Sequence, residues 1–194
     1  MRLPNTAFTE RPWRIHEFTK DFEVEDVWAL QTPGGPDGLA LLVAQLSGEG
    51  RNFEPSRMYR LLFAIRWRLG ALLGWDKDEH AVGARYASLR ERLPDDLREG
   101  TRGPDLRAVP LKSVYQTSDE WVTELGNRTV HAAMHIGWVG DDQGGYSAQM
   151  AILVKKNGLL GKVYMPFILP FRRIFVTPNL VKTISRGWQT RQAG

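Results

Sequence analysis

Cysteine is absent from this chain of 194 residues. Its absence excludes disulfide bonds, thiolate nucleophiles and cysteine-ligated metal centres. No apolar run approaches the ~20 residues that a membrane-spanning helix needs, and the first residues lack the apolar core of a signal peptide. These absences predict a cytoplasmic protein without stable membrane insertion.

Motifs that announce a particular chemistry are missing as well. Gly34, Gly35 and Gly38 do not lie between a strand and a helix at phosphate-loop spacing, and no nucleophile elbow or metal signature occurs. The arginines are scattered and the net charge is only +4, so the sequence does not predict nucleic-acid binding. We expect no metal and no cofactor.

Ionised side chains are missing from two long predicted strands between residues 129 and 154, apart from two aspartates in the turn that joins them. Pairing Trp138 with Tyr146 places apolar residues opposite one another on one face and His135 opposite Gln149 on the other. A solvated face normally carries charges. We therefore expect both faces of this hairpin to be covered by helices, a cavity or a partner chain.

The rest of the chain predicts an α+β protein, with a flexible arm over residues 1–12 and a single domain over 13–194. Hydrophobic periodicity and the positions of Pro and Gly predict the elements. In chain order they are a strand through 13–24, a short helix beginning at Glu25, helices at 39–46 and 57–73, a long irregular excursion over 76–110 with a short helix at 84–92, strands at 111–117 and 120–125, the central hairpin, and helices at 159–175 and 178–189. The four strands after the excursion form an antiparallel meander.

This order of elements resembles the START-like superfamily (SRPBCC; helix-grip or Bet v 1-like). The closer resemblance is to DUF2867, an uncharacterised bacterial family placed near that superfamily. It is carried by DVWAL at 26–30, FAIRW at 63–67, LGW at 73–75, LRERLP at 89–94, DEW at 119–121, NRTVH at 127–131, HIGW at 135–138, QMAILV at 149–154, NGLLG at 157–161 and PFR at 170–172. The resemblance implies a curved antiparallel sheet wrapped around C-terminal helices, with N-terminal helices between the first strand and the rest. It carries over no catalytic residue.

Ten residues are candidates for a ligand site, chosen as aromatic, methionine or polar side chains of the meander and the C-terminal helix: Trp121, Arg128, His131, Met134, His135, Trp138, Tyr146, Gln149, Met150 and Tyr164. The aromatic and methionine side chains suit the lining of an apolar pocket and are equally typical of an ordinary core.

The polar candidates also have two interpretations. His131 and His135 share a strand face but lie about 13 Å apart, too far to chelate one metal ion. Either is able to act as a general base or to form a structural hydrogen bond. Arg128 is able to bind a carboxylate or phosphate, or to pair with Glu120 or Glu124, which we expect at an exposed sheet edge.

Three functions are consistent with these features. The first is non-catalytic binding of a small hydrophobic or amphipathic molecule in a cavity between the sheet and the C-terminal helix. The second is an enzyme of the polyketide cyclase or dehydratase type, with His131, His135 or Arg128 near a small apolar substrate. The third is an interaction module in which one face of the hairpin is buried in a homodimer.

Overall fold

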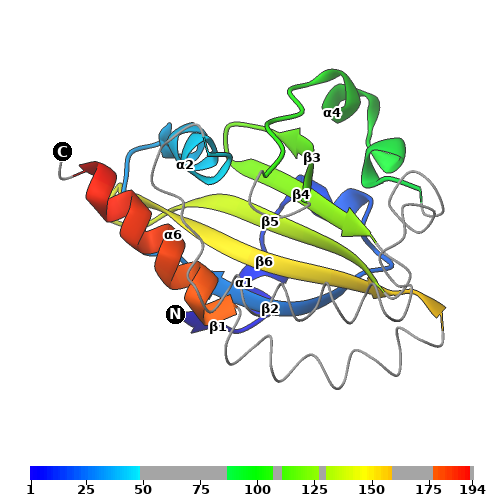
Figure 1. The fold of residues 1–194 in the computed structure, drawn as a ribbon, viewed down its shortest axis with the longest axis horizontal. Coiled ribbons are helices and arrows are strands. Elements are labelled where there is room, and N and C mark those ends of the chain that lie inside the picture. Colours follow the sequence, from blue (N-terminus) through cyan, green and yellow to red (C-terminus); the bar gives the residue numbers. More distant parts are fainter. Residues whose placement is uncertain (49–86, 107–110, 127–129, 159–176, 193–194) are drawn as a thin grey trace.

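A computed structural model describes residues 1–48, 87–106, 111–126, 130–158 and 177–192. Its centre is one six-stranded antiparallel sheet with the order β1-β2-β6-β5-β4-β3 (Figure 1). The elements are β1 Arg2–Leu3, α1 Thr6–Thr9, the 3-10 helix η1 Arg14–Glu17, β2 Glu23–Ala29, α2 Gly38–Leu46, the 3-10 helix η3 Leu89–Arg92, α4 Asp95–Glu99, β3 Lys112–Gln116, β4 Glu120–Gly126, β5 Val130–Gly140, β6 Tyr146–Lys156 and α6 Thr177–Gln192. The sheet is not strongly curled (Figure 1).

The predicted meander is confirmed, but the register predicted for its central hairpin is wrong by two residues. Trp138 lies opposite Ala148, and Tyr146 lies opposite Gly140. Asp141 tightens the turn, because its carboxylate accepts hydrogen bonds from the backbone N–H groups two and four residues later. The strands therefore continue further toward the turn than predicted. A shift of two leaves every side chain on its predicted face.

One face of the sheet packs against α2 and α6. The predicted helices at 39–46 and 178–189 are confirmed, and Val181, Ile184 and Trp188 face the sheet as their spacing predicts. The two helices also contact each other, since the Gln45 side-chain amide donates to the Ile184 carbonyl at 3.3 Å. This layer buries the apolar side of the hairpin.

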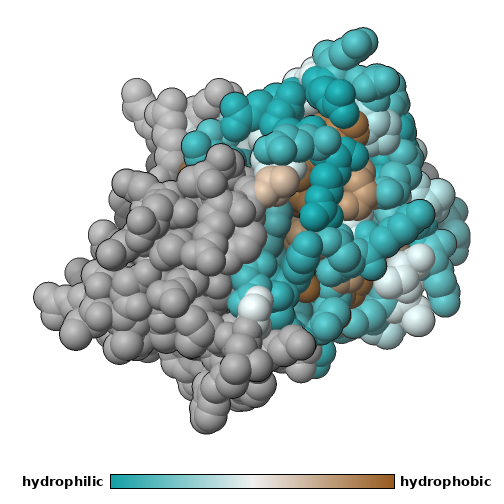
Figure 2. Space-filling model, turned by 90° about the vertical axis from the view of Figure 1, so that its right-hand side faces the viewer, coloured by the Kyte–Doolittle hydropathy of each residue, from teal (hydrophilic) through white to brown (hydrophobic). Residues whose placement is uncertain are grey.

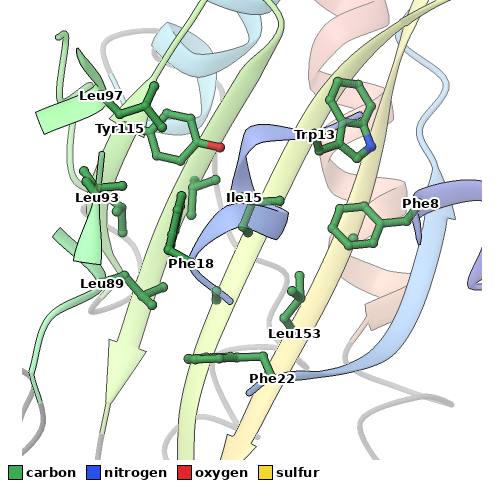
Figure 3. Close-up of a cluster of buried hydrophobic side chains, with 14 of the residues drawn as sticks. Phe8, Trp13, Ile15, Phe18, Phe22, Leu89, Leu93, Leu97, Tyr115 and Leu153 are labelled. Atoms are coloured by element: carbon green, nitrogen blue, oxygen red, sulfur yellow. The ribbon is translucent and has the colours of Figure 1, made fainter. Parts of the chain in front are cut away.

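The opposite face is covered by the N-terminal segment together with η3 and α4. Aromatic and aliphatic side chains from these elements form one buried cluster over the strands (Figure 3): Phe8, Trp13, Ile15, Phe18, Phe22, Leu89, Leu93 and Leu97. The expectation that both hairpin faces are covered is thus confirmed for the described residues. Burial of so many large side chains supplies much of the hydrophobic stabilisation.

Three predictions for the N-terminal part differ from the structure. Residues 1–12 were predicted as a flexible arm, whereas β1 pairs with β2 and Phe8 is fully buried. The predicted strand at 13–24 contains η1, and the predicted helix at Glu25 is β2, which pairs with β6. A bulge between Val24 and Asp26 interrupts the alternation of inward and outward side chains in β2, so the pattern of apolar and polar residues did not indicate a strand.

The described part of the excursion, 87–106, closes the edge of the sheet. A short helix was predicted over 84–92, and the structure has η3 within this range, begun by a capping box of Ser88 and Glu91. Farther along, the Arg102 guanidinium donates to the Ser113 carbonyl, and Asp105 accepts from the Ser113 N–H. These side chains occupy backbone groups of the edge strand β3 that would otherwise be free to pair with another chain.

The predicted helices at 57–73 and 159–175 lie outside the described residues. Within the described ranges, no helix is both long and apolar enough to cross a membrane. Figure 2 shows one side of the molecule, where hydrophilic side chains cover the described surface and apolar ones are visible only in the gaps between them.

Candidate functional site

Two buried glutamate–histidine pairs lie on the sheet face that the N-terminal segment covers. Glu120 and Glu124 share one side of β4, and His131 and His135 share the same side of β5. The Nε2 atom of His135 lies 3.1 Å from Glu120, and that of His131 lies 2.8 Å from Glu124. All four side chains are at most 3 % exposed. The prediction of an exposed sheet edge for the glutamates is wrong, because β4 is an interior strand.

Glu120 holds η1 against the sheet. Its carboxylate accepts hydrogen bonds from the Arg14 backbone N–H at 2.7 Å and from the Tyr115 hydroxyl at 2.7 Å, in addition to His135. Burial by itself raises the pKa of Glu120, but these donors outweigh it and leave the pKa below its usual value. Burial lowers the pKa of His135, against the opposing influence of Glu120. A neutral imidazole therefore donates to an ionised carboxylate at neutral pH.

Glu124 holds the start of η3, in the described part of the excursion, against the sheet. Its carboxylate accepts hydrogen bonds from the Ser88 hydroxyl and from the Leu89 backbone N–H at 2.9 Å, as well as from His131. Burial raises the pKa of Glu124, and its three donors lower it further than burial raises it. The two carboxylates thus attach two chain segments that are distant in sequence to one face of the sheet.

The structure separates the predicted site residues instead of bringing them together. Four apolar candidates, Trp121, Met134, Trp138 and Met150, are buried among α2, α6 and the sheet, and Tyr146 packs against them. The two histidines and Gln149 lie on the other face. The proposed pairing of His135 with Gln149 is wrong, since His135 lies opposite Ala151 and bonds Glu120. Arg128 and Tyr164 lie outside the described residues.

A first groove, here called the helix groove, lies between β2 and α6 and has a volume of about 460 Å³. Figure 1 shows the N-terminal end of α6 beside β1 and β2. The Ser185 hydroxyl accepts a hydrogen bond from the Gln31 N–H at 3.1 Å, which ties the helix to the segment after β2. Among the described residues, its lining contains apolar, polar and cationic side chains and no acidic one: Met1, Trp28, Gln31, Pro178, Val181, Lys182, Ser185, Arg186 and Gln189.

A second groove, here called the N-terminal groove, lies on the opposite face between α1 and the end of the sheet, with a volume of about 410 Å³. Its lining comes from residues 3–11 at the N-terminus and from β2, β5 and β6: Leu3, Thr6, Ala7, Glu10, Arg11, Ala29, Val139, Ser147, Ala148 and Gln149. Of the eight predicted site residues that the structure describes, Gln149 alone lines either groove. Its side-chain oxygen is buried and accepts no hydrogen bond in the described structure.

The sequence held a weak signal for one of these grooves. Lys182 and Arg186 are four residues apart on a predicted helix and so share one of its faces, at the margin of the apolar stripe. For the N-terminal groove no comparable signal exists, because a strand of two residues and a helix of four have no measurable period. No cluster of three or more potential metal ligands occurs within the described ranges.

Comparison with known proteins identifies one family. The family model described as "Protein of unknown function (DUF2867)" matches residues 18–179. No curated protein and no solved structure matches the chain. The match covers β2 to the start of α6, so both buried glutamate–histidine pairs lie inside it.

Proposed function

The chain belongs to the DUF2867 family, whose function is unknown, and we propose that it binds a small amphipathic molecule with an anionic head group in the helix groove. The observation that carries this proposal is the composition of the groove, whose described lining combines an apolar surface with two cationic side chains and no acidic one. Binding sites for small molecules are typically apolar, with a few placed polar groups.

The apolar part of the ligand would lie between the sheet and the helix. Trp28 projects from β2, and Val181 lies on the inward side of α6. The Trp28 indole N–H donates to Asp26 at 2.9 Å, which satisfies its polar atom and leaves the ring as an apolar surface. A hydrocarbon chain or ring placed here would lose contact with water on two sides.

The head group would lie against Lys182 and Arg186. They are one helical turn apart, so their side chains lie on the same face of α6. No ion pair of either cation occurs in the part of the chain that the structure describes. A carboxylate or phosphate would therefore find two cationic side chains, and no competing acid among the described residues that line the groove.

We also propose that the fold is a variant of the START-like, helix-grip plan. Two observations support this: the antiparallel meander is followed by a C-terminal helix on one sheet face, and its last strand, β6, pairs with β2 from before the helical region. Such a plan implies a ligand between sheet and C-terminal helix, which is where the helix groove lies.

The alternative functions receive less support from the site. A cyclase or dehydratase would need His131 and His135 beside its substrate, whereas each imidazole is buried against a glutamate and lines neither groove. The homodimer hypothesis assumed that a second chain buries one uncharged face of the hairpin. Elements of the same chain bury both faces instead. We therefore propose binding rather than catalysis.

The test compares dodecanoate with dodecyltrimethylammonium, which share a chain length and differ in head-group charge. Isothermal titration calorimetry should show dodecanoate binding preferentially. The double variant Lys182→Gln, Arg186→Gln should weaken it about fivefold, since exposed charge pairs contribute about 0.2–1 kcal/mol each. The control Lys20→Gln, Lys112→Gln removes the same charge from exposed sites outside the groove. Equal binding of both amphiphiles, or equal losses in both double variants, would overturn the proposal.

A further inference from the structure

We infer that the helix groove prefers a phosphate monoester to a head group with a single negative charge, and that Arg2 contributes to this preference as a third cation. The inference rests on the proposed function and narrows the class of head group that the groove binds. It is carried by the position of Arg2 in the sheet, which sets this side chain beside the lining of the groove.

The pairing of β1 with β2 places Arg2 next to a residue of the groove. Arg2 lies directly opposite Trp28, which lines the groove. The next pair, Met1 and Ala29, exchanges two backbone hydrogen bonds, of 2.8 and 3.0 Å. In an antiparallel ladder such a pair alternates with one that has no hydrogen bonds and whose side chains approach more closely. The side chains of Arg2 and Trp28 therefore begin about 4.5–5.5 Å apart, at the margin of the groove.

The alternation of side chains places Arg2 on the face of the sheet that carries the helix groove. Residues directly opposite one another in a sheet share a face, and their neighbours along each strand lie on the other face. Leu3 and Ala29, the neighbours of Arg2 and Trp28, both line the N-terminal groove on the opposite face. Val27, which is paired with Leu3, is buried in the cluster under the N-terminal segment. Arg2 therefore projects on the side of α6.

Cationic side chains thus approach the groove from two elements. Lys182 and Arg186 belong to α6, Arg2 belongs to the edge strand, and all three are exposed. Arg2 forms no ion pair in the ranges that the structure describes. Asp26 lies on the same face of β2, but it is fully buried and accepts the Trp28 indole N–H. A head group bound between Trp28 and α6 would therefore meet cations on both sides.

A phosphate monoester suits such an arrangement better than a carboxylate does. It carries a charge of about −1.5 to −2 at pH 7 and three strong acceptor oxygens, whereas a carboxylate carries one charge and two oxygens. Coulomb attraction is proportional to the charge of the ligand, so each cation stabilises a dianion by about twice as much as a monoanion. The guanidinium groups of Arg2 and Arg186 are also able to donate two hydrogen bonds each to phosphate oxygens.

The test compares dodecyl phosphate with its methyl ester, dodecyl methyl phosphate. The ester keeps the phosphorus and the alkyl chain but has only one negative charge. Isothermal titration calorimetry at a pH of about 7.5, below the critical micelle concentration of either compound, should show dodecyl phosphate binding about tenfold more tightly. This value assumes that each of the three cations contributes about a factor of two per unit of ligand charge.

Two single variants locate the preference. Arg2→Gln should weaken the binding of dodecyl phosphate about fivefold and that of the methyl ester only about twofold, because the removed cation acts on two charges in one ligand and on one in the other. The matched control is Arg11→Gln, which removes an exposed arginine of the same N-terminal segment that lines the groove on the opposite face. This control should change neither affinity.

Equal affinities of the two phosphates, or a preference that is unchanged in Arg2→Gln, would overturn the inference and leave the proposed function standing. An equal effect of Arg2→Gln and Arg11→Gln would also overturn it, because net charge and not position would then decide. If neither phosphate and no dodecanoate bound, the proposed function itself would fail, and the inference with it.

Discussion

Replacing Glu120 with glutamine should strongly destabilise the protein. The carboxylate accepts hydrogen bonds from the Arg14 N–H, the Tyr115 hydroxyl and His135 at 2.7, 2.7 and 3.1 Å, and it is almost fully buried. Glutamine has the same shape, but it removes the charge and converts one acceptor oxygen into an N–H₂ donor. That donor would face groups that are themselves donors.

The magnitude follows from the hydrogen bonds that the carboxylate accepts. Hydrogen bonds to a charged acceptor contribute about 1.5–3 kcal/mol each, so a glutamine oxygen that keeps one of these three bonds loses about 3–6 kcal/mol. The Tyr115 hydroxyl is able to rotate and accept, which favours the lower values. Since domains are stable by about 5–15 kcal/mol, the variant should remain folded with much less stability.

The assay is urea unfolding at neutral pH, followed by the fluorescence of the seven tryptophans. The matched control is Glu17→Gln, because Glu17 is a glutamate of the same segment that pairs with Arg14 at the surface and is 46 % exposed. An exposed pair of this kind contributes less than about 1 kcal/mol. If Glu120→Gln lost no more stability than Glu17→Gln, the anchoring role of the buried carboxylate would be refuted.

Three further predictions concern pH and packing. Lowering the pH from about 7 to 5 should reduce the free energy of unfolding. Burial holds the pKa of His135 below its usual value, so His135 binds a proton at a higher pH in the unfolded chain than in the folded protein. Replacing His135 with glutamine should therefore make the urea midpoint less dependent on pH. Gly38→Ala should cost about 1–3 kcal/mol in thermal unfolding, since its Cβ would lie 2.2 Å from the Trp138 ring, whereas Gly35→Ala, with no atom within 4 Å, should change stability little; equal losses would contradict this. The pKa of Asp21 should be about 2 in a carbon-detected NMR titration, because two bonded basic side chains outweigh the effect of burial, and a value near the ordinary one would show that these bonds are absent in solution.

Local pattern was a reliable guide where an element is long and regular. The meander, the helix at 39–46 and the last helix were predicted from their periods, and the charge-free hairpin correctly indicated that both of its faces are covered. β2 was missed because its bulge breaks the alternation that marks a strand. The hairpin register was missed because turn geometry, and not strand composition, sets it.

The sequence by itself determined which side chains share each face of the strands and of α6, because that depends only on the repeat of the backbone. It did not determine the partners of Glu120 and Glu124, since each carboxylate binds donors from η1 or from the start of η3, far away in the chain. Nor did it determine either groove, because each is built where the N-terminal segment meets a part of the chain more than 100 residues away in sequence. Contacts of this kind depend on how the sheet brings distant segments together, and the local periodicity of the sequence does not predict them.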